Sequence, residues 1–323
     1  MRSQARARAN IALIKYWGKS DTELNTPAVG SISITLDALW SDTEIEFDAA
    51  LAQDTLSLDG KEDAAQLARV SRCLDLLRRE ARVDLRARVS SRNNFPTGAG
   101  LASSASGFAA LVAAASRALG LALSPTALSA LARQGSGSAA RSIFGGYVEM
   151  RAGGAADGSD SFAVPLLSAT AWSLTVVIAV TQKYAKVTGS GEGMRSTADS
   201  SPYYQAWIES SQADLNVARA AILNQDFGVL AEVAEHNCLK MHALALAGRP
   251  PLLYWNAATV ACIDAIRALQ SASVPVFFTI DAGPQVKAVC LPEAAEQVAT
   301  QLRAVPGVLD IIVSELGPGI ETG

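Results

Sequence analysis

A run of small residues in the first third of the chain restricts the fold more than any other feature. From Gly98 to Gly120 nearly every residue is Gly, Ala, Ser or aliphatic. Such a run is typical of a glycine-rich turn that opens a helix packed on all sides, because small side chains let neighbouring elements approach closely. We therefore expect a buried helix here, with little room for bulky charged side chains.

Length and charge limit the remaining choices. At roughly 100–200 residues per domain, a chain of 323 residues predicts two lobes, and 50% hydrophobic with 18% charged residues indicates a folded protein. Lys and Arg number 27 and Asp and Glu 31, so the net charge is 27 − 31 = −4. A general binder of nucleic acid or of an anionic membrane should be basic, so neither partner is expected.

Residue periodicity divides the chain near residue 175, into lobes 1–175 and 176–323. The first lobe combines strands and helices, and the second is mostly helical before its last strands. Strands are predicted at 11–14, 31–36, 43–47, 56–58, 83–89, 143–150, 172–180, 274–280 and 286–289. Helices are predicted at 62–82, within 98–120, and at 203–224, 226–246 and 252–269, with a final helix and strand after them.

The four cysteines and two histidines show no metal-binding or disulfide spacing. No stretch approaches the roughly 20 apolar residues of a membrane-spanning helix, and the first ten residues do not lead into the apolar core of a signal peptide. We expect a cytoplasmic protein.

The strongest local motif is the segment from Pro96 to Ala105, which leads into the small-residue helix. Its backbone N–H groups and the helix N-terminus suit phosphate oxygens, and Ser103 and Ser104 add hydroxyls for phosphate or a metal ion. No Gly-Lys-Ser/Thr follows, so this is not a Walker A loop. The alternative is that the small residues serve helix packing alone.

Two further small-residue segments offer weaker signals. Gly135 to Arg141 places a five-donor guanidinium after two serines, which suits a carboxylate or phosphate, or else forms a capped helix start with a surface arginine. Thr188 to Met194 is either a mobile loop or another anion-binding turn.

Charged residues near both ends of the chain complete the candidate site. On an extended segment Lys15 and Lys19 share a face, so one polyanion can engage both, or they are solvated lysines at a strand end. Asp281 follows an apolar strand and precedes Gly283-Pro284. It is either a base or a carboxylate that caps the turn.

Taken in order, these segments resemble the diphosphomevalonate decarboxylase family of the GHMP kinase superfamily. The matching residues lie at 9–19, where Lys-Tyr-Trp-Gly-Lys is the most specific part, and at 94–106, 136–147 and 279–284. The resemblance implies a two-lobed α+β, GHMP kinase-like fold whose N-terminal lobe is similar to domain 2 of ribosomal protein S5. It implies ATP with Mg²⁺, conversion of (R)-5-diphosphomevalonate to isopentenyl diphosphate, ADP, phosphate and CO₂, and a homodimer.

The resemblance also implies roles for individual residues. Asp281 and Lys15 would face the 3-hydroxyl, Arg141 the substrate carboxylate, and Ser104 the transferred phosphoryl group, with Mg²⁺ carried by ATP near it. Substrate would contact Tyr16, Trp17, Gly18, Lys19, Arg69, Ser136, Gly137, Ser138, Ala139, Ala140, Arg141 and Gly191. ATP would contact Ser91, Asn93, Pro96, Gly98, Ala99, Gly100, Leu101, Ala102, Ser103 and Ser104.

Two departures from the family pattern leave the phosphate state of the substrate open. Val29-Gly30 stands where the family usually has Asn-Ser, and Ser190-Gly191 where it usually has Ser-Arg or Ser-Thr. The alternatives are a decarboxylase of 5-phosphomevalonate, a kinase that stops after phosphorylation, and a GHMP-fold protein that binds a ligand without catalysis. Asp281 has two open roles, abstraction of the hydroxyl proton or orientation of that oxygen.

Overall fold

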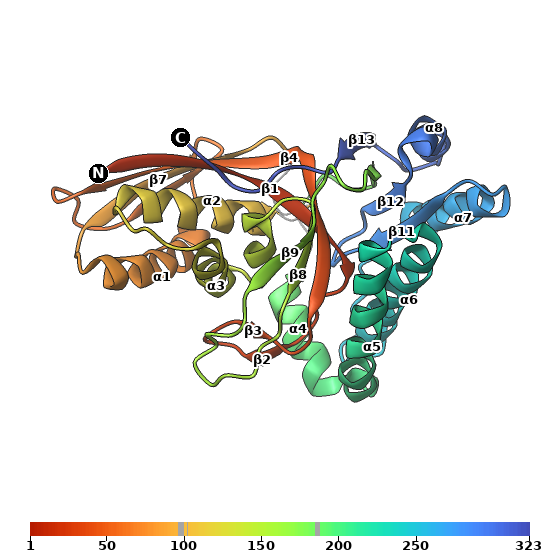
Figure 1. The fold of residues 1–323 in the computed structure, drawn as a ribbon, viewed down its shortest axis with the longest axis horizontal. Helices are drawn as coiled ribbons and strands as arrows, with labels where there is room; N and C mark the ends of the chain where they lie inside the picture. Colours follow the sequence, from red (N-terminus) through yellow and green to blue (C-terminus); the bar gives the residue numbers. More distant parts are fainter. Residues whose placement is uncertain (96–99, 102, 185–187) are drawn as a thin grey trace.

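The chain consists of two lobes that lie side by side along its long axis (Figure 1). The structure is a computed structural model, and it describes residues 1–95, 100–101, 103–184 and 188–323. Each lobe contains a β-sheet with helices packed against it. The predicted α+β, two-lobed architecture is confirmed.

The first sheet has eight strands among the described residues, in the order β14-β1-β4-β7-β5-β6, with β8 and β9 attached beside β4. Its strands are β1 (Arg2–Ile14), β4 (Ser31–Asp48), β5 (Thr55–Leu58), β6 (Lys61–Glu62), β7 (Arg86–Asn93), β8 (Tyr147–Met150), β9 (Ala163–Leu167) and β14 (Glu321–Thr322). Because β14 pairs with β1, the C-terminal residues return to the first sheet.

The strand β1 is longer than its sequence pattern predicted. Its first half alternates arginine with alanine, and alanine has a low strand propensity. In the structure Ala5 and Ala7 face the core, while Arg6 pairs with Asp42 across the strands at 2.6 Å. Cross-strand packing and ion pairing therefore outweigh intrinsic propensity. Strand β4 likewise joins the two predicted strands at 31–36 and 43–47 into one.

Helices cover one face of this sheet. They are α1 (Ala64–Ala81), α2 (Ser103–Ala118), α3 (Pro125–Gly135) and the 3-10 helix η1 (Gly137–Ile143). The helix α2 packs on β1 and β4, and its alanines from Ala105 to Ala115 are buried, as the run of small residues predicted. Helix α3 was not predicted from the sequence, although Ser124 caps it and Pro125 occupies its first turn, which is a recognisable start signal.

The second sheet is antiparallel, in the order β11-β12-β10-β13. Its strands are β10 (Thr175–Val180), β11 (Val276–Ile280), β12 (Val286–Cys290) and β13 (Asp310–Glu315). The helices of this half are α4 (Ser190–Ser200), α5 (Tyr204–Leu223), α6 (Phe227–Leu246), α7 (Ala257–Ser271) and α8 (Ala295–Arg303), with the 3-10 helix η2 (Pro292–Ala294). A small hairpin, β2 (Lys19–Asp21) and β3 (Thr26–Pro27), projects below the first sheet (Figure 1).

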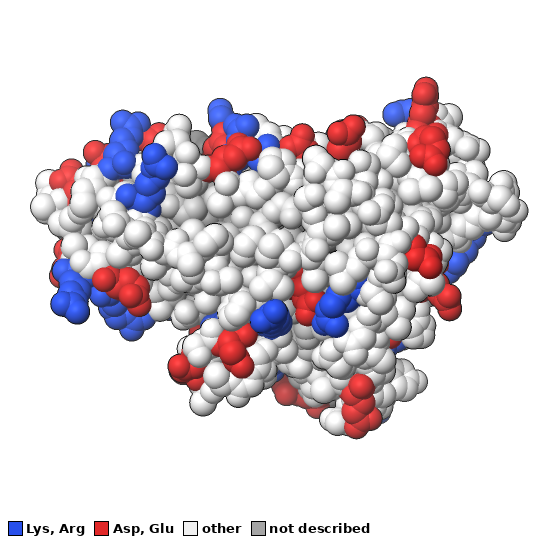
Figure 2. Space-filling view, viewed as in Figure 1, with Lys and Arg blue, Asp and Glu red and all other residues white. Residues whose placement is uncertain are grey.

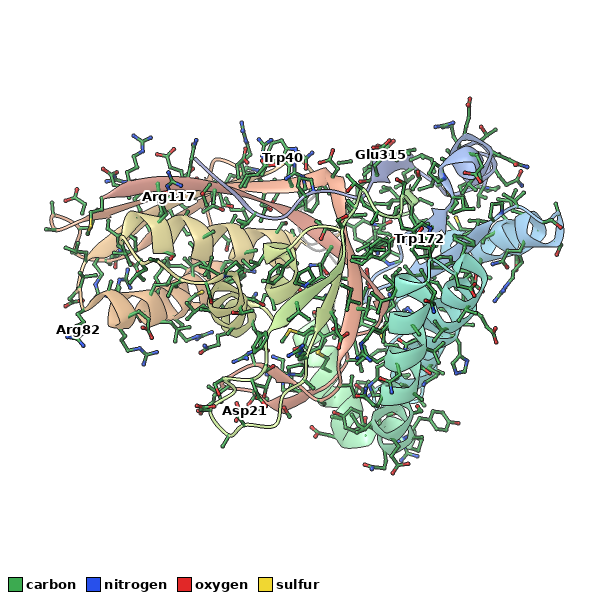
Figure 3. The ribbon with its side chains drawn as sticks, viewed as in Figure 1. Asp21, Trp40, Arg82, Arg117, Trp172 and Glu315 are labelled. Carbon is green, nitrogen blue, oxygen red and sulfur yellow. The ribbon has the colours of Figure 1, made fainter. Side chains whose placement is uncertain are left out.

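A shared hydrophobic core joins the lobes. It includes Ile11 of β1, Ile34 of β4, Val176 of β10 and Phe277 of β11. Trp172, which lies at the junction in Figure 3, stacks on Tyr147 of β8 with ring centroids 5.5 Å apart. The ends of β1 and β11 are therefore held in a fixed relation, and the candidate site lies there.

Two further expectations from the sequence concern the cysteines and membrane-spanning helices. All four cysteines are free and buried. Within those residues, no helix is both long enough and apolar enough to cross a membrane.

Candidate active site

A carboxylate held by two lysines lies where the lobes meet. Asp281, directly after β11, accepts hydrogen bonds from Lys15 Nζ at 2.7 Å and from Lys287 Nζ at 3.2 Å, one on each carboxylate oxygen. Both lysines are almost fully buried, whereas the Asp281 side chain is 27% exposed. The carboxylate is therefore the member of the group that faces open space.

Helix α6 positions both chain segments of this group. Its Asn237 accepts the backbone N–H of Lys15 at 2.7 Å, and its His242 ring bonds the carbonyl of Ile280 at 3.1 Å. Burial lowers the pKa of His242 to about 3, so the ring is neutral and donates to that carbonyl. One rigid element thus aligns the end of β1 with the end of β11.

The charge state of Asp281 follows from its two neighbours. Burial alone would raise the pKa of its carboxyl, but the ammonium groups of Lys15 and Lys287 outweigh this effect and hold that pKa below its ordinary value. Burial lowers the pKa of Lys287, and Asp281 opposes that shift. Asp281 is therefore an anion at neutral pH, well suited to accept a hydrogen bond and weak as a base.

Arg141, on η1, is a second buried charge beside this group. It donates to Asn10 Oδ1 from Nε at 3.3 Å and from Nη2 at 3.1 Å, and to Ser31 Oγ from Nη1 at 2.6 Å. Contacts with the described residues thus occupy three of its five N–H groups, and one remains on each terminal nitrogen. Burial lowers the pKa of Arg141 to about 10, so it stays charged at neutral pH. Its two remaining donors suit a carboxylate.

Lys15, Arg141 and Asp281 line an inner pocket with a volume of about 200 Å³, and Lys287 contacts Asp281 without belonging to that lining. Among the predicted substrate residues and catalytic groups, the pocket brings together Lys15, Tyr16, Trp17, Lys19, Arg69, Ser136, Gly137, Ser138, Arg141, Gly191 and Asp281. The lining does not include Gly18, Ala139 or Ala140. We name Lys15, Arg141, Asp281 and Lys287 the site floor.

The aromatic residues before Lys19 have different environments. The Tyr16 hydroxyl is buried without a hydrogen-bond partner among the described residues, and its ring fills the space that a side chain at Gly137 would occupy. Trp17 is fully buried and bonds Thr197 of α4 at 2.8 Å, so it mainly ties the segment to α4. Gly18 has φ +97°, which explains the glycine.

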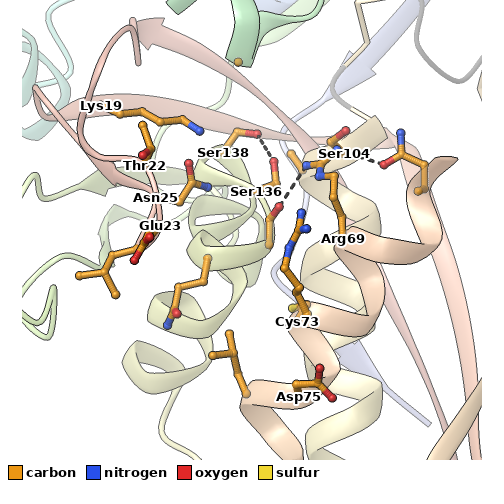
Figure 4. A pocket seen from close by; sticks show the side chains of 18 of the residues that line it. Lys19, Thr22, Glu23, Asn25, Arg69, Cys73, Asp75, Ser104, Ser136 and Ser138 are labelled. Carbon is orange, nitrogen blue, oxygen red and sulfur yellow. Dashed lines mark hydrogen bonds between the residues drawn. The ribbon is translucent and has the colours of Figure 1, made fainter. Parts of the chain in front are cut away.

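The inner pocket opens into a large basic cleft of about 1690 Å³. In Figure 4, Lys19 extends from one wall and Arg69 of α1 from the opposite wall, with Ser136 and Ser138 between them. Arg69 donates to the Gly135 carbonyl at 3.0 Å and packs over the Phe108 ring. The cleft is also lined by Arg72 and Arg195. We name Lys19, Arg69, Arg72 and Arg195 the site mouth.

Basic side chains continue along α1 beyond the mouth. The cleft lining includes Arg79 and Arg82, and Arg82 projects from the end of α1 in Figure 3. On the face shown in Figure 2, Lys and Arg lie over this end of the first lobe with Asp and Glu among them, while the centre of the face carries little charge. A protein with a net charge of −4 thus concentrates positive charge at one cleft, which suits an anionic ligand.

A second, mostly apolar pocket adjoins the N-terminus of α2. It is lined by Ser91 and Asn93 of β7, by Ser103 and Ser104, and by apolar residues such as Phe108. Ser91 bonds Thr43 at 2.9 Å, and Asn93 accepts from Ser41. Because Ser103 and Ser104 also line the basic cleft, the two spaces meet at the first turn of α2.

The predicted phosphate-binding segment is only partly described. Pro96, Gly98, Ala99 and Ala102 lie outside the described residues. Leu101 is buried, and Gly100, with φ +82°, lies so close to Gly283 that an added Cβ would be 3.3 Å from its Cα. The Gly100 carbonyl also accepts from Lys287 Nζ at 3.2 Å. Gly100 therefore contacts the turn that carries Asp281.

The structure differs from the sequence prediction at residues 188–194. Helix α4 begins at Ser190, so Gly191 and Met194 lie in its first turns and not in a loop or a separate anion-binding turn. Two glycines obscured the helix signal, because glycine lowers helix propensity by about 1 kcal/mol. Packing of the buried Met194 against Trp17 in the same apolar cluster overrides that cost.

Sequence reasoning missed three residues of the site. Lys287 is a charged residue inside the apolar strand Val286–Cys290, and that signal was available. Arg72 and Arg195 lack any comparable signal, since each lies on an ordinary polar helix face. Only the folded cleft identifies them.

A metal ion would have to rely mainly on ligand oxygens. No cluster of three or more His, Cys, Asp or Glu able to hold a metal occurs in the described ranges. The exposed Ser104 hydroxyl at the start of α2 offers one oxygen. Mg²⁺ commonly binds through phosphate oxygens, waters and few protein groups, so this donor set fits a nucleotide-borne Mg²⁺.

Family models match both halves of the chain. Residues 7–163 match the diphosphomevalonate decarboxylase-like N-terminal domain, and residues 176–312 match the mevalonate 5-diphosphate decarboxylase C-terminal domain.

Individual relatives agree with the family models. Diphosphomevalonate decarboxylase mvd1 of Aspergillus fumigatus is 39% identical, over 95% of this chain and 81% of the relative. Mevalonate diphosphate decarboxylase from Staphylococcus aureus has a TM-score of 0.93 at 40% identity, covering 100% and 98% of the two chains. The structure of MDDEF in complex with MVAPP, AMPPCP and magnesium also gives 0.93, at 39% identity and 100% and 99% coverage. This chain belongs to the diphosphomevalonate decarboxylase family.

Proposed function

We propose that this chain uses ATP to convert (R)-5-diphosphomevalonate to isopentenyl diphosphate, ADP, phosphate and CO₂. The observation that carries the proposal is the site floor: an ionised Asp281 between two buried lysines, next to Arg141 with two free donors. This arrangement matches a substrate with a hydroxyl and a carboxylate close together. Family membership and the solved relative in complex with MVAPP, AMPPCP and magnesium support it.

The substrate is proposed to extend from the floor to the mouth. Its carboxylate pairs with Arg141, because two parallel N–H donors bind a carboxylate bidentately. Its 3-hydroxyl donates to Asp281 and accepts from the third donor of Lys15, whose other two contact Asp281 and the Ala12 carbonyl. Its diphosphate reaches Lys19 and Arg69 of the basic cleft.

The nucleotide is proposed to lie on the first lobe, with its base in the apolar pocket beside Ser91 and Asn93. Its phosphates then meet the first turn of α2, where the partial positive charge of the helix N-terminus favours anions. The Ser104 hydroxyl would help to hold a nucleotide-borne Mg²⁺, which would supply positive charge to the transferred phosphoryl group.

The first chemical step is phosphorylation of the 3-hydroxyl. Phosphoryl transfer depends chiefly on positioning and charge stabilisation, so the nucleophile need not be ionised beforehand. With a depressed pKa, Asp281 orients the hydroxyl and takes its proton only as the new P–O bond completes. The bond between the γ-phosphorus and its bridging oxygen breaks, and ADP leaves.

The second step removes two groups. The 3-phosphate departs with the C3–O electron pair, and the electrons of the bond to the carboxylate form the new C2–C3 double bond as CO₂ leaves. Phosphorylation is needed because a 3-hydroxy acid has no carbonyl to accept those electrons. Lys15 and Lys287 stabilise the negative charge that gathers at the floor.

The test measures ADP and CO₂ together, with mono- and diphosphorylated mevalonate offered separately. We expect equal release of both products from the diphosphate and much less from the monophosphate. ADP without CO₂ would indicate a kinase, and preferred turnover of the monophosphate would indicate the rival decarboxylase. If neither substrate yields ADP, the chain is a ligand-binding protein and the proposal fails.

Three further predictions stay proposals. The division into 1–175 and 176–323 is supported by family models that end at residue 163 and resume at 176.

The homodimer rests on resemblance, and light scattering of the purified chain tests it. A cytoplasmic location, supported by four free cysteines, is tested by cell fractionation.

A further inference from the structure

One arginine of the site mouth has no assigned role. Arg195 lies on α4, four residues after Gly191, so the two residues share one face of the helix. Both line the same cleft as Lys19 and Arg69. On the face of α4 that contains Gly191, Arg195 is therefore the first positively charged residue that lines the cleft.

The spacing of Gly191 and Arg195 on α4 is relevant to the departure from the family pattern at residues 190–191. Where the family usually carries arginine or threonine, Gly191 has no side chain to offer a ligand. Successive residues on one helix face are about one turn apart, roughly 6 Å, which a long arginine side chain can span. Arg195 can therefore deliver a guanidinium to the region that a side chain at position 191 would reach.

The charges around Arg195 are those of an anion site. Lys19 and Arg195 have no hydrogen bond or ion pair through their side chains in the described part of the chain, and Arg69 bonds only Gln66 and a carbonyl. Burial lowers the pKa of Lys19, and the positive charges of Arg195 and Arg69 lower it further. These three cations repel one another until an anion joins them.

Acidic groups in the same cleft do not neutralise this trio. The cleft lining includes Glu23, Asp75 and Asp84. Asp75 already pairs with Arg78 at 2.6 Å, and Asp84 with Arg86 at 3.2 Å. Glu23, on the hairpin below Lys19, points away from Arg69 in Figure 4. An anionic ligand is therefore needed to balance the positive charge of the site mouth.

We propose that Arg195 determines substrate specificity by binding the terminal phosphate of the diphosphate together with Lys19 and Arg69. The inference rests on the proposed function and deepens it. A monophosphate lacks the group that Arg195 contacts, so discrimination between the two substrates arises here. Arg195 acts in binding and not in the chemical step at Asp281.

The first experiment compares Arg195→Gln with the unchanged protein on both substrates. A hydrogen bond to a charged group is strong enough that its loss should raise KM for diphosphomevalonate about tenfold or more. We expect kcat to change less than about twofold, and KM for 5-phosphomevalonate to stay the same. Arg303→Gln, which makes the same charge change on the exposed end of α8, should leave all constants unchanged.

The second experiment is a rescue by Gly191→Arg in the Arg195→Gln background. An added Cβ at Gly191 meets nothing within 4 Å, and its φ is outside the left-handed region, so the substitution fits the helix. We expect the double variant to recover most of the lost affinity for the diphosphate. Such a recovery shows that the guanidinium, delivered from either turn of α4, is what the ligand requires.

Binding of inorganic pyrophosphate, measured by calorimetry, separates this inference from the proposed function. Pyrophosphate should bind the unchanged protein and the double variant more tightly than Arg195→Gln, whether or not the protein releases CO₂. Equal pyrophosphate affinity in all three proteins overturns the inference. An equal rise of KM for both substrates in Arg195→Gln also overturns it, because Arg195 would then not read the second phosphate.

Discussion

The floor and the mouth of the site carry similar numbers of positive groups but treat them differently. At the floor, Lys15 and Lys287 share the carboxylate of Asp281, and Arg141 is held by three hydrogen bonds to Asn10 and Ser31. At the mouth, Lys19, Arg72 and Arg195 have no carboxylate partner among the described residues. The floor keeps a net charge of 3 − 1 = +2, but its charged groups are held in place by hydrogen bonds within the protein, whereas the mouth lacks such carboxylate partners among the described residues.

This difference indicates a division of work. Buried charges must be paired and hydrogen-bonded, because an unpaired charge is costly away from water, and pairing also fixes their geometry. Fixed geometry at the reacting atoms favours the transition state. Half-exposed cations keep their water until an anion arrives, so they favour binding. We therefore expect floor variants to affect kcat and mouth variants to affect KM.

The largest effect is expected from Asp281→Asn. An amide keeps the shape of the side chain but cannot accept the hydroxyl proton, so turnover should fall at least about a hundredfold while substrate binding is retained. Single-turnover ADP release and calorimetric binding measure the two quantities. Near-normal turnover would remove Asp281 from the mechanism.

A smaller loss is expected from Arg141→Lys. A lysine ammonium cannot form the bidentate pair with a carboxylate, and it leaves the Asn10 and Ser31 contacts incomplete. We expect kcat/KM to fall about tenfold by the loss of one charge-assisted hydrogen bond. Unchanged kinetics would assign Arg141 to structure and would weaken the distinction between floor and mouth.

The pH profile of Lys287→Met tests how the floor sets the charge of Asp281. In the unchanged protein the pKa of Asp281 is lowered, so activity should persist below the ordinary carboxyl range and disappear only as pH falls through the lowered value. Removing one nearby cation raises that pKa, which should move the acid limb of kcat upward by about one pH unit or more.

The control for this profile is Lys61→Met on the exposed strand β6, which should leave the acid limb in place. Circular dichroism at each pH confirms that the fold is retained. An acid limb at the same pH in Lys287→Met and the unchanged protein would show that Lys287 does not tune Asp281.

The smallest effect is expected from salt. Exposed charges are screened as the Debye length falls from about 10 Å at 0.1 M towards 3 Å at 1 M, whereas buried pairs are screened much less. Raising KCl should therefore raise KM for diphosphomevalonate severalfold and leave kcat nearly constant. A parallel fall in kcat would mean that salt screens the charges of the floor as strongly as those of the mouth.

Local patterns in the sequence predicted much of the fold. The small residues of α2, the apolar runs of β10 and β11, and the long amphipathic helix α1 were recognisable because their signals lie within a few residues. The failures have physical causes. In β1, alanine has a low strand propensity, but cross-strand pairing and burial stabilise the strand. In α4, two glycines weaken the helix signal in the sequence, but packing of Met194 against Trp17 stabilises the helix.

The sequence by itself determined the chemical groups available: a phosphate-binding turn, a guanidinium after small residues, two lysines around an aromatic pair, and an acid at a strand end. Only the tertiary structure decided which of them meet. Lys15 and Asp281 are 266 positions apart and bond at 2.7 Å because α6 holds both segments, and Lys287 and Arg195 enter the site through strand pairing and helix register. Turn and helix signals act over a few residues, whereas charge pairing depends on distances that packing alone sets.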